Sequence, residues 1–374
     1  MKVYLDYNAT SPIRPEAEAA ALAALRIGGN PSSVHAAGRT ARAVVETARE
    51  QVAALAGARP QDVVFTSGGS EANTLAVLSA RPSGCDRIIV GATEHVSVLD
   101  AAQAAGLRVE VWPVNRDGVA DLAWLGEALK AGGRPFVALM LANNETGVIQ
   151  PVAAAAELVR AAGGWLHVDA VQAAGRLPID IAALGADSLA LSGHKLGGPQ
   201  GCGALVLRPG VEPARMTFGG GQERGRRGGT ENLSGIAGFG AAAAASDPSA
   251  NEQTRWRDAC AAELASGGGV EVLGAGASRI GNTLCFAAPG YASELQVMGL
   301  DLAGVMVSSG AACSSGKVKA SHVVTAMGRP DLASCSIRVS GGWASTEQDW
   351  IAFSQAWRLM HAHHAQRARA LVEA

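Results

Sequence analysis

Between about residues 60 and 210, short apolar runs alternate with alanine-rich stretches, and this alternation restricts the fold more than any other feature. Strands separated by helices of about 10–15 residues are typical of βαβ units, in which successive strands lie parallel. We therefore predict an α/β fold with a mostly parallel sheet of the seven-stranded type, with ligands bound at the carboxyl ends of the strands. The runs expected to form strands are 63–66, 87–90, 136–141, 165–169, 188–191 and 203–207.

The pattern changes after residue 245. Residues 246–251 have the polar and proline-containing composition of a linker. A helical stretch, a glycine-rich link at 267–269 and shorter strands such as 282–286 follow. Since 374 residues are enough for two domains, we expect a large domain over 15–248 and a small α+β domain over 249–374.

Composition excludes several functional classes. With 48% apolar and 17% charged residues, the chain has the composition of a globular protein. A formal net charge of −2 argues against binding to nucleic acid or to acidic membranes. No apolar run is long enough to span a membrane, and Asp6 comes too early for a signal peptide. We therefore expect a cytoplasmic protein.

The cysteines and a histidine cluster give little support for a metal site. None of the six cysteines forms a Cys-x-x-Cys pair, which weakens zinc and thioredoxin-type interpretations. Most are expected to be reduced and buried, as in the apolar runs around Cys202 and Cys285. His361, His363 and His364 could bind a metal, but a solvent-exposed helix is the favoured interpretation, and no metal site is predicted.

Lys195 and Asp169 follow two apolar runs that we expect to form neighbouring strands. Lys195 ends the sequence Ser-Gly-His-Lys after the run 188–191, and Asp169 ends the run 165–169. A lysine amine forms a Schiff base with the aldehyde of pyridoxal phosphate. A carboxylate beside the pyridine nitrogen keeps that nitrogen protonated, so that the ring accepts electrons. The pair therefore predicts a pyridoxal phosphate enzyme.

Two glycine-rich segments are candidate anion sites. Gly69 and Ser70 follow the first predicted strand and open a helix, where backbone N–H groups and the Ser70 hydroxyl could bind a phosphate. The alternative is an ordinary helix N-terminus with a capping carboxylate. The glycine- and arginine-rich loop 219–230 is either an anion-binding loop or a basic surface loop.

Three polar residues near other strand ends could contact the cofactor. His95 could stack on a planar ring or move protons, although a single histidine is more often structural. Asn144 could bond the 3-oxygen of the pyridine ring, or it could simply belong to a turn. Gln172, three residues after Asp169, could bond the same oxygen or be an ordinary helix residue.

Cys313 and Arg338 are the candidates for substrate chemistry. Cys313 lies in a run of serine, glycine and alanine, and nearby Lys317 and Lys319 would favour its thiolate form. The alternative is an unreactive loop thiol. Arg338, on an expected strand of the small domain, could hold a substrate carboxylate through two parallel hydrogen bonds, or form a surface or interdomain salt bridge.

Taken together, these segments resemble the cysteine desulfurases of the NifS/IscS type, within the class V aminotransferases. The resemblance runs nearly from end to end, with the motifs in the same order. It comprises residues 5–10, 29–33 with His35, 66–73, 93–95, 143–145, 167–169, 192–195, 219–230 and 308–315.

The resemblance implies the pyridoxal-phosphate-dependent transferase fold of type I and a set of cofactor contacts. Residues 1–14 would pack with the small domain, which carries the catalytic cysteine loop. Lys195 would carry the cofactor, Asp169 would hold the pyridine nitrogen, and His95 would stack on the ring. The remaining implied contacts are Asn144 and Gln172 to the ring, and Gly69, Ser70, Ser192 and His194 to the phosphate.

The same resemblance implies the reaction and the assembly. Cys313 would attack the sulfur of L-cysteine, leaving an enzyme persulfide and alanine, while Arg338 would hold the substrate carboxylate. Thr230 would reach the phosphate bound by the neighbouring subunit, which implies a homodimer. The persulfide sulfur would pass to an acceptor protein, for iron–sulfur cluster assembly or tRNA thiolation.

Some positions depart from the family pattern. Gly69 and Ser70 stand where relatives commonly have alanine and threonine, and Ala311 stands where serine is common. The segment after Cys313 is more basic than usual, and the C-terminal tail has no recognisable docking sequence for an acceptor. A selenocysteine lyase or an aminotransferase of the same fold is the alternative activity. A non-catalytic sulfur-relay or scaffold protein is the alternative class, and it would need neither Lys195 nor Asp169.

Overall fold

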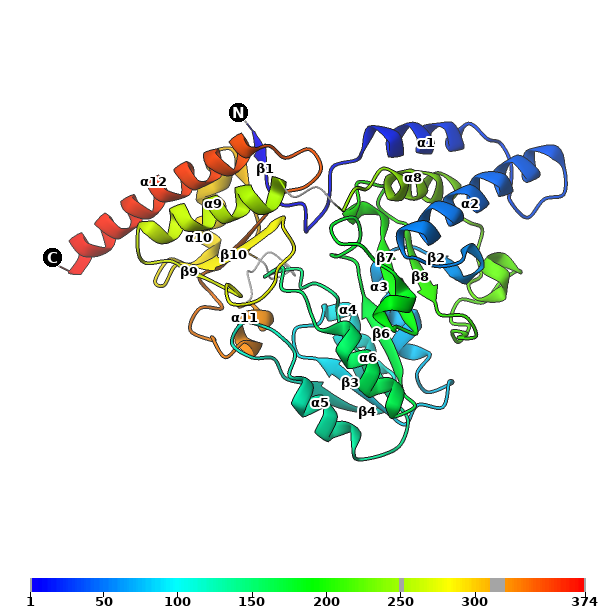
Figure 1. Ribbon diagram of the computed structural model, residues 1–374. Coiled ribbons are helices and arrows are strands. Elements are labelled where there is room, and N and C mark those ends of the chain that lie inside the picture. Colours follow the sequence, from blue (N-terminus) through cyan, green and yellow to red (C-terminus); the bar gives the residue numbers. More distant parts are fainter. Residues whose placement is uncertain (1, 249–251, 310–319, 373–374) are drawn as a thin grey trace.

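The computed structural model describes residues 2–248, 252–309 and 320–372. Its largest element is a seven-stranded sheet (Figure 1). Among these strands, β8 runs antiparallel to both of its neighbours and the other adjacent pairs run parallel. The mostly parallel sheet predicted from the sequence is therefore confirmed. In order across the sheet, the strands are β2 (Val63–Thr66), β8 (Gly203–Leu207), β7 (Ser188–Ser192), β6 (Trp165–Asp169), β5 (Pro135–Ala138), β3 (Arg87–Gly91) and β4 (Arg108–Trp112).

Both faces of this sheet are covered by helices, which explains why its central strands read as continuous apolar runs. Alternate residues of one strand belong to different cores: Ile88 and Val90 pack on one face, and Ile89 packs on the other. The first face carries α3 (Gly69–Leu78) and α4 (Val96–Ala104). The opposite face carries α2 (Ala36–Leu55), α5 (Leu122–Leu129), α6 (Val152–Ala161), α7 (Ile181–Leu184) and α8 (Leu233–Ala244), and α1 (Pro15–Leu25) packs on α8 (Figure 1).

Apart from shifts of one residue at the ends of β3 and β7, the large sheet differs from the prediction at two places. The run 136–141 was expected to be one strand, but β5 ends at Ala138, and Met140 and Ala142 beyond it line the cavity described below. Leu139 and Leu141 still donate backbone hydrogen bonds to β6, after which Ala142 pairs with Ile149 across a turn. Strand β4 was not predicted, because it lies at the sheet edge and only Trp112 of its residues is fully buried.

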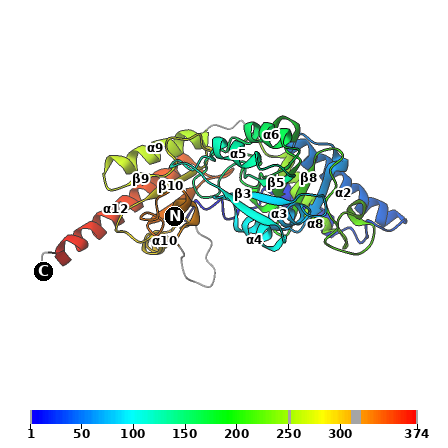
Figure 2. The same cartoon turned by 90° about the horizontal axis from the view of Figure 1, so that it is seen from below.

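The last third of the chain forms a second sheet, which has three antiparallel strands. Its central strand is β10 (Thr283–Ala287), which lies between β9 (Glu271–Val272) and β12 (Ser336–Ser340). The helices α9 (Glu252–Ser266), α10 (Ser293–Leu302) and α12 (Glu347–Val372) share one core with it, and α11 (His322–Ala326) packs on the other face. Figure 2 shows α12 running away from the large sheet towards the C-terminus. The domain boundaries at residues 14 and 248 stay predictions.

The start of the chain connects the two sheets. Strand β1 (Val3–Tyr4) pairs in parallel with β11 (Val305–Met306), and Asp6 forms a bridge with Ser340 at the end of β12. The chain then crosses to the large sheet, where the Ser11 N–H donates to the carbonyl oxygen of His194. This crossing places residues 6–11 directly beside Lys195. Within the described residues, no helix is both long and apolar enough to cross a membrane.

Candidate active site

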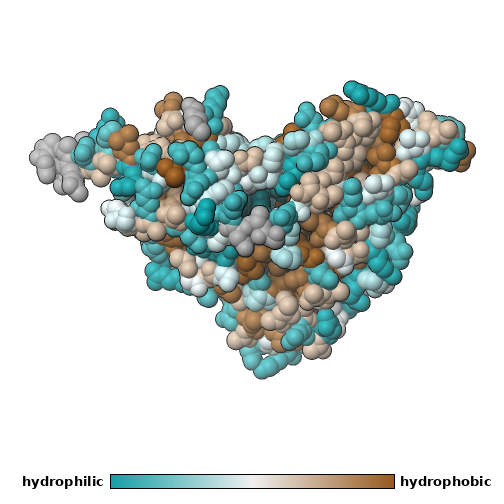
Figure 3. Space-filling model, turned by 45° about the horizontal axis from the view of Figure 1, so that its top comes forward, coloured by the Kyte–Doolittle hydropathy of each residue, from teal (hydrophilic) through white to brown (hydrophobic). Residues whose placement is uncertain are grey.

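A cavity of about 250 Å³ lies where the strands of the large sheet end, and it brings together residues that are far apart in the sequence. Figure 3 shows hydrophilic side chains around a hollow in the middle of the molecule, where its two parts meet. Nine of the ten residues expected to contact the cofactor line this cavity. They are Gly69, Ser70, His95, Asn144, Asp169, Gln172, Ser192, His194 and Lys195. Thr230, the tenth, is exposed and lies elsewhere.

Lys195 reaches the cavity because the buried strand β7 ends at Ser192 and a single 3-10 turn, Gly193–Lys195, follows. Its Nζ donates hydrogen bonds to the carbonyl oxygens of Asn8 at 2.5 Å and Ala9 at 2.8 Å. Burial, followed by the charges of Arg338 and Arg176, lowers the pKa of Lys195 to about 7. A large fraction of this amine is therefore neutral and nucleophilic near neutral pH.

Asp169 is held by hydrogen bonds to both of its oxygens. Its Oδ1 accepts from the N–H of Val171 at 2.9 Å, and its Oδ2 accepts from Nδ2 of Asn73 at 2.8 Å. The Asn73 Oδ1 in turn faces Nε2 of His167 at 3.0 Å, and the His167 Nδ1 faces the hydroxyl of Ser188 at 2.9 Å. A buried chain of polar groups thus ends on the carboxylate.

Which groups donate and which accept in this series of hydrogen bonds follows from the groups at its two ends. The carboxylate of Asp169 can only accept, so Asn73 presents its amide nitrogen there and its oxygen to His167. Burial lowers the pKa of His167 to about 3, so the ring is neutral, with the proton on Nε2. Neither Asn73 nor His167 was predicted to contribute to the site, although they lie inside the motifs 66–73 and 167–169.

His95 begins α4 as its N-cap residue. Its Nδ1 accepts a hydrogen bond from the backbone N–H of Ser97 at 3.2 Å and lies 2.8 Å from the Ser97 hydroxyl. Burial lowers the pKa of His95. In the neutral ring, an accepting Nδ1 places the proton on Nε2. His95 can therefore present a planar ring and one N–H group to the cavity that it lines.

Asn144 and Gln172 lie on the same cavity wall but differ in their hydrogen bonding. The Oδ1 of Asn144 is buried and has no hydrogen-bond partner in the described structure. Gln172 is already engaged, because its Nε2 donates to the carbonyl oxygen of Asn8 at 3.0 Å and its Oε1 accepts from Arg176. An unpaired buried acceptor costs about 1–3 kcal/mol, so Asn144 is poised for a donor that the protein itself does not supply.

The other end of the cavity has the features of an anion site. Helix α3 begins at Gly69, and its first N–H groups have no partner inside the helix. His194 lies beside them, and its Nδ1 is 3.1 Å from the hydroxyl of Thr10. Burial and then the charge of Lys195 lower the pKa of His194 to about 4, so this ring is neutral. A Cβ at position 69 would lie 2.7 Å from Cγ2 of Val171, which explains the glycine there.

The start of α3 also has the capping carboxylate that was considered as the alternative to a phosphate site. The Glu71 Oε2 accepts from the backbone N–H of Ser67 at 2.7 Å, as a capping carboxylate does. Arg227 of the glycine-rich loop donates to the Glu71 Oε1 at 2.9 Å. Capping by Glu71 leaves the N–H groups at the start of the helix available, so the two interpretations are compatible.

Arg338 is buried on β12, close to the cavity but not on its wall. It donates to the Asp6 carboxylate at 2.7 Å and to the carbonyl oxygen of Asn144 at 3.2 Å, and its buried Nε has no partner. Its backbone pairs with that of Ser308, which is the approach to the cysteine loop. Arg338 therefore forms a salt bridge with Asp6, and this pair is largely buried rather than at the surface.

The loop 219–230 is anchored by a buried carboxylate that the sequence analysis did not identify. Glu223 accepts from Nη1 and Nη2 of Arg49 at 2.7 and 2.9 Å, and from the N–H of Phe65 at 2.9 Å. Arg226 pairs at the surface with Glu212. The loop is therefore fixed to α2 and β2.

Cys313 lies outside the described residues. The other cysteines, Cys85, Cys202, Cys260, Cys285 and Cys335, are free and buried, and burial raises the pKa of each thiol. These thiols are poor nucleophiles.

The histidine cluster near the C-terminus packs against an aromatic side chain, since His364 stacks on Tyr291 with ring centroids 4.1 Å apart. No group of side chains in the described part of the chain is arranged to hold a metal ion.

Comparison with known proteins places this geometry in a family. Residues 3–353 match the family model "Aminotransferase class-V". The chain belongs to the class-V aminotransferase family. Cysteine desulfurase IscS of Dictyoglomus turgidum is 37% identical over 361 residues, covering 93% of this chain and 91% of the relative. A cysteine desulfurase of Cereibacter sphaeroides is 43% identical over 345 residues, covering 89% and 88%.

A solved structure of a NifS-like protein supports the same family assignment. The NifS-like protein from Rickettsia africae superposes with a TM-score of 0.89 at 34% identity, covering 97% of this chain and 100% of that one. The predicted resemblance and the predicted α/β fold are both confirmed.

Proposed function

We propose that this protein is a pyridoxal-phosphate-dependent cysteine desulfurase, which converts L-cysteine to L-alanine and transfers the sulfur to an acceptor protein. The proposal rests on one observation: a single cavity is lined by Lys195, whose pKa is lowered, by the hydrogen-bonded carboxylate of Asp169 and by the unpaired amide oxygen of Asn144. Relatives 37% and 43% identical over most of the chain are named cysteine desulfurases, which supports the same activity.

The residues of the cavity fit pyridoxal phosphate. Lys195 would bind the aldehyde carbon of the cofactor, and Asp169 would bind its pyridine nitrogen. The unpaired Oδ1 of Asn144 would accept a hydrogen bond from a substituent of the ring. The start of α3 with Ser70 would bind the phosphate. When bound, the cofactor supplies an electron sink that stabilises negative charge on the substrate Cα.

The protein's own groups then have separable roles. Asp169, oriented by Asn73, would keep a proton on the pyridine nitrogen. The Lys195 amine, neutral near pH 7, would take and return a proton at the substrate Cα. Arg338 would bind the substrate carboxylate, for which its unpaired Nε is available beside its existing bond to Asp6.

Cys313 would carry the sulfur. Its thiolate would attack the sulfur of cysteine as the C–S bond breaks, giving alanine and a Cys313 persulfide. The described residues on either side of its loop support this, since both ends are fixed near the cavity. Ser321 donates to the Glu145 carboxylate at 2.6 Å, and Nε2 of His322 lies 3.0 Å from the carbonyl oxygen of Glu94, next to His95. Before the loop, Ser308 pairs with Arg338.

We also propose a cytoplasmic homodimer in which Thr230 reaches the phosphate bound by the other subunit. Thr230 is exposed at the end of the anchored loop, and Phe218 at its start leaves 79% of its surface exposed. Such exposed apolar surface beside a loop is consistent with an interface. The acceptor would be a protein of iron–sulfur cluster assembly or tRNA thiolation.

A visible spectrum combined with product assays tests the proposed function. The purified protein should absorb as a lysine-bound cofactor and should form alanine and sulfide from cysteine with a reductant. Lys195→Ala should lose both the absorbance and turnover, whereas the control Lys130→Ala, on the exposed Lys130–Glu127 pair, should keep both. A colourless wild-type protein, or full turnover by Lys195→Ala, would refute the assignment.

A further inference from the structure

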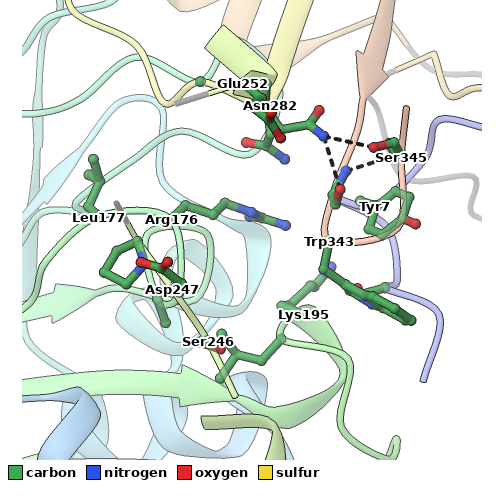
Figure 4. Close-up of a pocket in the computed structure, with 18 of the residues that line it drawn as sticks. Tyr7, Arg176, Leu177, Lys195, Ser246, Asp247, Glu252, Asn282, Trp343 and Ser345 are labelled. Carbon is green, nitrogen blue, oxygen red and sulfur yellow. Dashed lines mark hydrogen bonds between the residues drawn. The ribbon is translucent and has the colours of Figure 1, made fainter. Parts of the chain in front are cut away.

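A second and larger cavity, of about 560 Å³, adjoins the first, and Lys195 lines both of them. Its walls come from the chain start near Arg14, the loop after β6 near Arg176, the beginning of α9 and the turn at Trp343. Figure 4 shows the side chain of Arg176 extending into this space between Asn282 and Lys195. A volume of this size is typical of a small-molecule site.

Positive charge dominates this cavity. Among the described residues that line it, Arg14, Arg176, Lys195 and Arg279 are basic, and Asp247 and Glu252 are acidic. None of the three arginines forms a salt bridge with a carboxylate of the described part of the chain. The three side chains are each partly exposed. Like charges that line one cavity without a carboxylate partner repel one another and create a positive potential that favours an anion.

The hydrogen bonds of these arginines leave donors unused. Arg14 donates to the carbonyl oxygens of Leu196 and Ala245 and lies over the ring of Trp343. Arg176 donates only through Nη1, to Gln172. The Arg279 guanidinium makes no hydrogen bond in the described structure, and its Nη1 is buried.

The pKa values of these arginines show how far their charges are compensated. Burial lowers the pKa of Arg176 to about 10, and no carboxylate opposes that shift. Burial also lowers the pKa values of Arg14 and Arg279, where the charges of Glu16 and Asp258 oppose the shift in part. The Nε1 of Trp256, on the same wall, is a further buried donor without a partner. The missing complement is therefore a group of acceptor oxygens with negative charge, which guanidinium groups bind in a bidentate manner.

We propose that this cavity binds a small molecule with two or more anionic oxygens, a phosphate or a polycarboxylate, held chiefly by Arg176 and Arg279. Binding itself does not depend on the function proposed above. Because Lys195 lines both cavities, the bound anion raises the pKa of its amine in the cofactor-free protein.

Calorimetric titration and thermal unfolding of the cofactor-loaded protein test this, with inorganic phosphate and citrate as probes at constant ionic strength. We expect saturable binding of at least one probe in the millimolar range or tighter. Loss of a charge-assisted hydrogen bond in Arg279→Gln or Arg176→Gln should weaken binding by at least about tenfold. Arg26→Gln, which changes an exposed arginine outside the cavity, is the matched control and should bind as the wild type does.

A further variant keeps the test decisive if Arg176→Gln does not fold. Glu252→Gln removes an exposed carboxylate of the cavity wall, so it should tighten binding of the same probe. Binding of phosphate alone would identify a phosphate site, and binding of citrate alone a polycarboxylate site. No binding of either probe at about 10 mM, or unchanged affinity in both Arg279→Gln and Glu252→Gln, would overturn the proposal.

Discussion

Replacing Arg49 by methionine should strongly destabilise the protein, because it leaves the carboxylate of Glu223 buried without its charge partner. The two side chains are only 4% and 2% exposed, and two hydrogen bonds of 2.7 and 2.9 Å join them. Removing one member of such a pair costs about 3–5 kcal/mol. With about 2.1 cal/mol/K of unfolding entropy per residue over 374 residues, this lowers Tm by roughly 4–6 °C.

Calorimetry of three variants tests that magnitude. Glu212→Gln breaks the Arg226–Glu212 pair, whose carboxylate is 63% exposed, and should cost less than about 1 kcal/mol. The double variant Arg49→Met/Glu223→Gln removes the unpaired charge and keeps an acceptor for the Phe65 N–H, so it should be more stable than Arg49→Met alone. If Arg49→Met is no less stable than Glu212→Gln, the buried anchor of the loop does not stabilise the fold as argued.

Three further predictions concern the site. The rate of pyridoxal phosphate binding to the cofactor-free protein should rise with pH through about 7, because Lys195 loses its proton there, and it should level off at higher pH. Stopped-flow absorbance measures this rate, and a rate that still rises between about pH 8 and 10 would contradict the lowered pKa of Lys195. Asn73→Ala should raise the dissociation constant of the cofactor about tenfold or more, since Asp169 loses a hydrogen bond to its charged form; unchanged affinity in equilibrium dialysis contradicts the orienting role. Thr230→Ala should weaken cofactor retention without unfolding the chain, and a fully active monomer in sedimentation would exclude the shared site.

Much of the fold was predictable because its signal is local. Strands β2, β6 and β8 match the predicted ranges 63–66, 165–169 and 203–207, since their apolar runs are buried on both faces. The position of the site followed from the same pattern, because parallel strands bring Asp169 and Lys195 to one edge. The end of β5 was misjudged, because Leu139, Met140 and Leu141 are apolar and buried although the regular strand ends at Ala138.

The parts that escaped prediction depend on contacts between distant residues. Arg49 and Glu223 are 174 positions apart, and nothing in either local sequence indicates the other. His167 reads as an ordinary strand residue until α3 places Asn73 against it. Likewise, the second cavity exists only where the chain start, α9 and the loop after β6 meet, so its unpaired arginines cannot be recognised from spacing.

The most direct test of the proposed reaction is mass spectrometry of the protein after a short exposure to L-cysteine. The account predicts one added sulfur on the peptide that contains Cys313 and none on the buried cysteines. Cys313→Ser should still bind the cofactor but form no alanine, because a hydroxyl is barely ionised at neutral pH, whereas the control Cys85→Ser should form alanine as the wild type does. Alanine formation by Cys313→Ser at the normal rate, or the added sulfur on another cysteine, would contradict the desulfurase mechanism.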